Sequence, residues 1–234
     1  MPAKKPKAQP HFTPELYAFL EELVENNDRD WFTANKARYE EHVKEPMLRF
    51  ISDFQAPLAR VSKHFVADPR PQGGSMFRIY RDTRFAKDKT PYKTHLAAHF
   101  RHETAKDVHA PGFYLHIEPE SVMIGAGLWR PDSGVAAQIR EAIIEDPAGY
   151  KRAAHAKKLR EQAEFHGESL KRPPRGIDAD HPLIDDLKRK SWAAMIALPP
   201  ESVMQPDFID RVAGACKLLA PLTRFLTEAV GQPF

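Results

Sequence analysis

Residues 112–129, with the sequence GFYLHIEPESVMIGAGLW, decide the fold. The segments 112–118 and 121–129 are β-prone, and turn-forming residues around Pro119 separate them. Two such segments joined by so short a connection predict an antiparallel hairpin. Alternation along the second strand places Val122, Ile124, Ala126 and Leu128 on one face, and Met123, Gly125, Gly127 and Trp129 on the other. The two glycines leave room on their face for the close approach of either a ligand or a packed helix.

The segments around this hairpin complete an α+β pattern. Candidate strands at 76–81 and 96–102 precede it, and 192–198 is a candidate last strand. Helical signals begin at Thr13-Pro14, near Asp30, at Pro46 and at 132–133, run from 146 through about 165, and resume at 206. We predict one α+β domain over residues 12–230, with a central, mostly antiparallel sheet of about four to five strands and the N-terminal and C-terminal helices packed on it. Residues 1–11 are predicted to be a disordered basic tail.

Composition excludes several classes of protein. The 234 residues are 42% hydrophobic, but charges or prolines interrupt every apolar run well before the roughly 20 residues that a membrane-spanning helix needs. The single cysteine, Cys216, cannot form an internal disulfide, and MPAKKPKAQP has no apolar segment typical of a signal peptide. We therefore expect a protein with no membrane association that resides in the cytoplasm.

Charge is unevenly distributed along the chain. The formal net charge is +3, and the tail lysines Lys4, Lys5 and Lys7 account for it. Residues 15–45 are mainly acidic, whereas 78–93 and 151–175 are mainly basic. Such segregation can build a positive face that attracts phosphates or nucleic acid, but the acidic region can equally neutralise the basic ones within the fold.

The densest charged segment, FRIYRDTRFAKDKTPYK at 77–93, is the candidate binding site. Arginine presents a planar fork to phosphate or carboxylate, while lysine and hydroxyl groups donate to the same oxygens. The candidate anion ligands are Arg78, Arg81, Arg84, Lys89, Tyr92 and Lys93, with Asp82 and Glu118 as candidate catalytic acid or base residues. The alternative is that Asp82 and Asp88 pair with Arg84 and Lys89 and brace the loop.

Several motifs in order give the chain a family resemblance. The 77–93 run follows NNDRDWF at 26–32 and Arg38-Tyr39, and precedes GFYLHIEP, GLWRP, LKRPPRG and Asp180-His181-Pro182. From about Phe12 to Phe225 the chain resembles the bacterial and fungal domain-of-unknown-function family numbered 2461. The resemblance implies a single domain of this size and supplies no mechanism. His95 departs from the family pattern, which has Asn at this position.

The 11 histidines raise the question of a metal site. His95, His99 and His102 cluster in the sequence, and His116 and Glu118 are two residues apart, which puts both on one face of a strand. Two histidines and a carboxylate can bind iron or zinc, but the chain has no HExxH motif and one cysteine is too few for a cysteine-based zinc site. We therefore predict no metal site, and the chain has no nucleotide-binding glycine motif that would assign a cofactor.

Three functions are compatible with these patterns. We favour binding of a phosphorylated or carboxylated small molecule through the basic segment, which requires a concave pocket. The second hypothesis is a nucleic-acid-binding accessory protein, with the tail, 78–93 and 151–175 as one basic track. The third is a protein-interaction domain without catalysis, whose charges only brace the fold.

Overall fold

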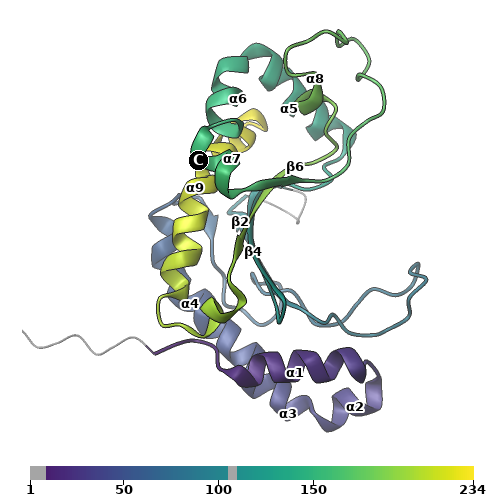
Figure 1. Cartoon of the computed structure of the whole chain (residues 1–234), viewed down its shortest axis with the longest axis vertical. Coiled ribbons are helices and arrows are strands. Elements are labelled where there is room, and N and C mark those ends of the chain that lie inside the picture. Colours follow the sequence, from purple (N-terminus) through teal and green to yellow (C-terminus); the bar gives the residue numbers. More distant parts are fainter. Residues whose placement is uncertain (1–8, 105–109) are drawn as a thin grey trace, which may run out of the picture.

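The computed structural model describes residues 9–104 and 110–234 and has an α+β fold (Figure 1). The N-terminal helices are α1 (Pro14–Glu25), α2 (Arg29–Ala34), α3 (Lys36–Tyr39) and α4 (Glu45–Ala59), with a π-helical segment, Glu40–Lys44, joining α3 to α4. The strands are β1 (Phe65–Val66), β2 (Leu96–His102), β3 (Gly112–Glu118), β4 (Ser121–Leu128), β5 (Glu164–His166) and β6 (Trp192–Leu198). The remaining helices are α5 (Ser133–Glu145), α6 (Pro147–Ala154), α7 (Lys157–Gln162), α8 (Ile184–Leu187), a 3-10 helix (Pro200–Met204) and α9 (Phe208–Ala229).

All the strands belong to one antiparallel sheet with the order β1-β2-β3-β4-β6-β5. The predicted hairpin is confirmed: β3 and β4 pair from Gly112 opposite Gly127 to Glu118 opposite Ser121. The candidate last strand is also confirmed, since β6 pairs with β4 along its whole length. The expected α+β class and antiparallel sheet are therefore present, and the short edge strands β1 and β5 bring the sheet to six strands within the described residues.

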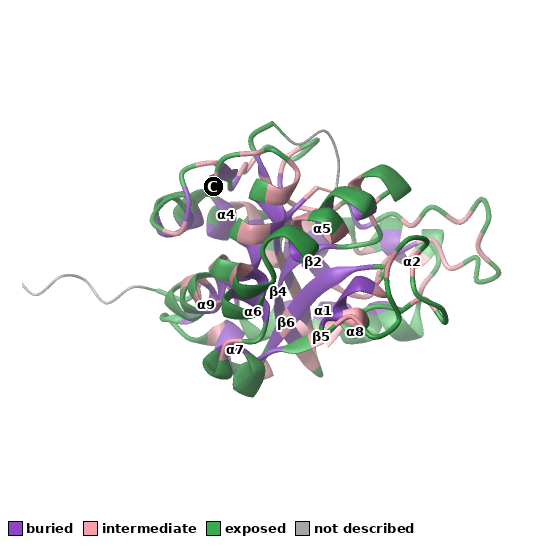
Figure 2. Cartoon of the chain, turned by 90° about the horizontal axis from the view of Figure 1, so that it is seen from above, coloured by how far each residue is buried: buried purple, intermediate pink, exposed green. Residues whose placement is uncertain are grey.

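The two faces of the sheet have different surroundings. On β3, Phe113, Leu115 and Ile117 are fully buried, whereas Tyr114, His116 and Glu118 are only partly buried. Helices α4 and α9 lie against one side of the sheet, and α9 packs on β4 (Figure 1). Figure 2 shows the buried centre of the sheet beneath helices with exposed outer surfaces. We call the side that carries Tyr114 and His116 the open face.

Two local predictions are wrong, and one edge strand was missed. Residues 76–81 are not a strand: they form isolated bridges at Met76 and Tyr80, because β1 and residues 75–77 share the free edge of β2. The edge strand Phe65–Val66 was not predicted. The helix expected from 146 through about 165 ends at Ala154, restarts at Lys157 and gives way to β5 at Glu164.

The N-terminal boundary is described only in part. Residues 1–8 of the predicted tail lie outside the described residues, whereas His11 is described and its Nε2 lies 2.9 Å from Asp53 Oδ2. Phe12 is fully buried and belongs to the hydrophobic core. In the ranges 9–104 and 110–234, no helix combines the length and the apolar character needed to cross a bilayer.

Candidate functional site

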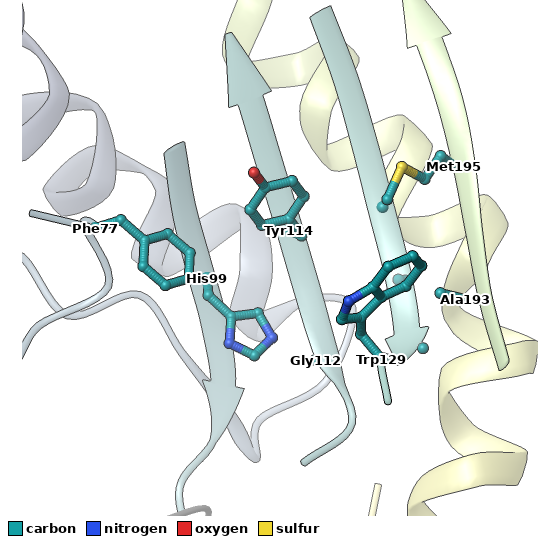
Figure 3. A pocket seen from close by; sticks show the side chains of 10 residues that line it. Phe77, His99, Gly112, Tyr114, Trp129, Ala193 and Met195 are labelled. Carbon is teal, nitrogen blue, oxygen red and sulfur yellow. The ribbon is translucent and has the colours of Figure 1, made fainter. Parts of the chain in front are cut away.

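The open face holds an apolar pocket of about 320 Å³ above the middle strands (Figure 3). Gly125 lies between Tyr114 on β3 and Met195 on β6 in the strand register. A Cβ atom at Gly125 would lie 3.4 Å from Met195 and 3.6 Å from Tyr114, so a longer side chain there would extend into the pocket. The lining residues are Phe77, His99, Gly112, Tyr114, Gly125, Ala126, Gly127, Trp129, Ala193 and Met195.

Two other glycines are required by close packing under this pocket. Gly127 has φ of +121°, and a Cβ atom there would lie 2.0 Å from the Trp192 carbonyl oxygen. A Cβ atom at Gly112 would lie 2.3 Å from His99 Nε2. The predicted glycine face therefore adjoins a pocket. Gly112 and Gly127 line this pocket where neighbouring atoms leave no room for a side chain.

His99 forms one wall of the pocket and is only 8% exposed. Burial, with a smaller effect of Arg101, lowers the pKa of His99 to about 4, so the imidazole is neutral at pH 7. Its Nδ1 is buried without a hydrogen-bond partner among the described residues. Phe77 stacks on it, with ring centroids 6.4 Å apart and an interplanar angle of 12°. An unpaired buried nitrogen is costly, which makes His99 a candidate ligand contact.

A second, more polar cleft of about 700 Å³ adjoins the apolar pocket, and Phe77 and His99 line both. Its cationic side chains come from separate elements: Lys36 on α3, Arg78 after Phe77, Arg101 on β2, and Lys44 on the π-helical segment, where Lys44 forms an ion pair with Glu40, which also lines the cleft. Among the described residues, no carboxylate forms an ion pair with Lys36 or Arg78. Arg101 donates hydrogen bonds to the Gly73 and Gly74 carbonyl oxygens. We call this space the cationic cleft.

Most charges of the predicted binding segment are paired within the segment. Arg84 donates to Asp82 at 2.7 Å, and Arg81 donates to Asp88 at 2.5 Å and to the Thr90 hydroxyl. Lys89 Nζ donates to the Thr83 carbonyl oxygen at 2.9 Å. Arg84 holds the pKa of Asp82 at about 2, and the Thr90 backbone N–H followed by Arg81 does the same for Asp88. These contacts are the bracing arrangement, although Arg81 and not Lys89 is the partner of Asp88.

The remaining predicted ligands lie in different places. Tyr92 is buried and its ring stacks on Phe32 with centroids 4.1 Å apart. Lys93 Nζ donates to the Arg78 carbonyl oxygen and lies 5.1 Å from the Phe77 ring centre, and burial lowers its pKa. Arg78 is the member of the six predicted anion ligands that lines the cationic cleft.

Glu118 and the histidines are distributed over both faces. Glu118 ends β3 on the open face, with Oε2 3.5 Å from His116 Nε2. His102 is buried on the other face, where it contacts Thr104 and the Pro233 carbonyl oxygen, so the sequence cluster His95, His99 and His102 does not form one site.

Sequence reasoning considered His99 only as a metal ligand and did not single out Tyr114 or Arg101. His99 and Tyr114 face each other across β2 and β3, and Arg101 is two residues further along β2. Period-two alternation from the glycine face is the signal that could have found them, because it also runs through these two strands.

Comparison with known proteins identifies the family and nothing closer. No curated protein and no solved structure matches the chain. A family model described as "Conserved hypothetical protein (DUF2461)" matches residues 15–225, which include the helices around the cationic cleft and every strand of the sheet. The chain therefore belongs to the DUF2461 family, as its sequence motifs suggested.

Proposed function

We propose that this protein binds a small molecule that carries a phosphate or carboxylate group on an apolar body. The observation that carries the proposal is the junction of the two spaces: Phe77 and His99 line both the apolar pocket and the cationic cleft. A ligand lying across this junction would place its apolar part over Gly125 and its anionic group toward Arg78.

The apolar pocket suits the body of such a ligand. Its volume of about 320 Å³ falls at the lower end of the range for small-molecule sites, roughly 300–1,000 Å³. Trp129 and Met195 come from one side and Phe77 from the other (Figure 3), so a flat apolar group would be contacted on opposite edges. The His99 ring lines this pocket, and its Nε2 is the ring nitrogen nearest the lining residue Gly112.

The cationic cleft suits the anionic group. Arg78 and Lys36 reach it from different elements, and no carboxylate among the described residues neutralises either by an ion pair. A guanidinium can bind phosphate or carboxylate with two parallel hydrogen bonds. In contrast, Arg81 and Arg84 already bind Asp88 and Asp82, so the proposed anion contact moves from the loop to Arg78.

Two further expectations remain as proposals. A carboxylate with a pKa of about 2 is a weak base, which makes Asp82 unsuited to proton abstraction at neutral pH, and Glu118 is the candidate acid or base that remains. Cytoplasmic location is proposed because the sequence offers Cys216 no second cysteine with which to form an internal disulfide.

A thermal-shift screen tests the proposal, using nucleotides, sugar phosphates, di- and tricarboxylates, and short single-stranded oligonucleotides. A ligand present at 100 times its dissociation constant should raise the melting temperature by several degrees. Arg78→Gln should weaken binding of the hit about 10- to 100-fold, because one charge-assisted hydrogen-bond contact is lost. Arg84→Gln is the matched control, since Arg84 is exposed and paired with Asp82, and it should bind like the wild type.

Other outcomes would redirect the assignment. Equal binding by Arg78→Gln and the wild type would refute the cationic cleft as the anion site. An oligonucleotide hit that weakens steeply with salt would favour the nucleic-acid hypothesis, because phosphate contacts release counterions. No shift with any compound would contradict small-molecule binding and favour the protein-interaction domain.

A further inference from the structure

Three metal-ligating side chains meet on the open face beside the apolar pocket. His116 and Glu118 are two residues apart on β3, and His95 directly precedes β2. Because Leu96 pairs with Ile117, the β2–β3 register continues with His95 opposite Glu118. One ligand atom from each of the three residues lies within 4.8 Å of the others.

The contacts of His116 leave one nitrogen available toward this group. Its Nδ1 lies 3.0 Å from the Tyr114 hydroxyl, while its buried Nε2 has no hydrogen-bond partner in the described part of the chain. Glu118 Oε2 lies 3.5 Å from this Nε2, but the two atoms do not form a hydrogen bond. The rings of His95 and His116 have centroids 4.5 Å apart. Two imidazoles and a carboxylate therefore converge around an unsatisfied buried nitrogen.

We propose that His95, His116 and Glu118 bind a divalent first-row transition metal ion, with Zn²⁺ as the reference ion. Zinc ligand distances of about 2.0–2.2 Å separate tetrahedral ligand atoms by roughly 3.4 Å, so small side-chain rotations would bring the three ligand atoms together. Nδ1–H of His116 would then donate to the Tyr114 oxygen, which leaves the Nε2 lone pair for the metal. A partner on the second nitrogen is the usual way in which a metal-binding histidine is oriented.

Three protein ligands leave a coordination position open, which is typical of zinc and iron sites that exchange a water or a substrate. Tyr114 both contacts His116 and lines the apolar pocket, so the ion would lie next to the proposed ligand site. Metal binding does not depend on anion binding, because Arg78 and the cationic cleft supply none of the three ligands.

The chain contains a natural control for this site. On β5, His166 and Glu164 repeat the spacing of His116 and Glu118, and His166 Nε2 lies 3.9 Å from Glu164 Oε2. Both side chains are more exposed than His116, and the described residues provide no third ligand near them. If any histidine–carboxylate pair were enough to bind zinc, substituting His166 would lower the zinc affinity as much as substituting a residue of the proposed site.

Isothermal titration calorimetry with Zn²⁺ tests the proposal on the full chain, purified without a polyhistidine tag and stripped with a chelator. The wild type and His166→Asn should bind one ion per chain with the same affinity. His95→Asn and Glu118→Gln should each weaken binding at least about 100-fold, because each removes one of three ligands. Visible absorption of bound Co²⁺ should report tetrahedral or five-coordinate geometry in the wild type and be lost in both ligand variants.

Thermal unfolding of the metal-free variants shows whether a loss of zinc binding reflects a lost ligand or a misfolded protein. Glu118 and His95 are partly exposed, so both variants should melt within a few degrees of the wild type without metal. If His95→Asn fails to fold, Glu118→Gln, which preserves side-chain shape, decides alone. Unchanged zinc affinity in Glu118→Gln, or an equal loss in His166→Asn, would overturn the proposal, as would the absence of saturable binding by the wild type.

Discussion

The two faces of β3 and β4 are built from alternating residues of the same strands, yet one face packs into the core and the other borders a pocket. Phe113, Leu115 and Ile117 point into a core closed by helices and have no solvent exposure. Tyr114 and His116, between them in sequence, lie on the face with the pocket and the unsatisfied histidine nitrogen. Packing selects the first set, because any apolar residue of the right volume serves there. The second face packs ring against ring around a pocket and holds a buried nitrogen without a hydrogen-bond partner among the described residues, and ligand binding gives a reason for that arrangement.

The sharpest test of this difference removes one large side chain from each face. Phe113→Ala should lower the free energy of unfolding by about 3–5 kcal/mol, since Phe113 is fully buried and contacts Phe65 edge to face. Met195→Ala, from the edge of the apolar pocket, should cost about 1 kcal/mol or less. Urea unfolding measures both, and equal losses would show that the open face is packed like a core.

The same contrast explains what could be predicted of the fold. The hairpin, β6 and the long C-terminal helix follow from periodicity, because each has one buried face: Val212, Cys216 and Leu219 of α9 are all fully buried. Residues 76–81 have strand composition but do not pair along their length, since the edge of β2 is shared with Phe65–Val66. Such competition for an edge is a tertiary effect that local composition does not encode.

The sequence predicted the parts of the candidate site that follow the alternation of residues along a strand, and no other part. Alternation correctly placed Gly125 and Gly127 on one face and His116 with Glu118 on one face. It could not show that Arg81 and Arg84 bind Asp88 and Asp82 while Arg78 enters the cleft, because charge pairing in an irregular loop depends on side-chain geometry. It also could not bring His95 to His116, which requires the register of two strands.

Acid sensitivity provides a second test, through His99 on the open face. Its pKa is lowered from 6.5 to about 4, mainly by burial, so between these pH values the unfolded chain binds a proton that the folded chain does not. The free energy of unfolding should therefore fall as pH drops from about 6.5 to 4, by at most about 3 kcal/mol for this residue. His99→Asn should lose this part of the pH dependence, measured by urea unfolding at a series of pH values. Identical slopes for the two proteins would mean that His99 is solvated in solution.

A larger side chain on each face should change the free energy of unfolding by a smaller amount, and the two substitutions should act in opposite directions. Gly125→Leu points into the apolar pocket and should leave stability unchanged or raise it by up to about 1 kcal/mol, because the strand loses a flexible glycine. The neighbouring Ala126→Leu points into the core and should cost about 1–3 kcal/mol by overpacking.

The same pair can be tested with a dye of the proposed ligand class. Native-state binding of the anionic aromatic dye 8-anilinonaphthalene-1-sulfonate, followed by fluorescence, should weaken at least about 10-fold in Gly125→Leu, because leucine fills the pocket. Undiminished dye binding in a folded Gly125→Leu protein would place the dye site elsewhere.

The smallest effect is expected in the basic loop, which belongs to neither face and whose charges pair within the loop. Arg84 is 77% exposed, so Arg84→Gln should not measurably change the melting temperature, because exposed ion pairs contribute little. Arg81 is 28% exposed and joins Asp88 to Thr90 across the loop. Arg81→Gln should therefore increase the rate of limited cleavage by subtilisin within residues 82–90 several-fold, with little change in global melting, since proteolysis reports local opening. Equal cleavage rates in Arg81→Gln, Arg84→Gln and the wild type would show that the pairing does not order the loop, and the loop arginines would then be free to bind an anion after all.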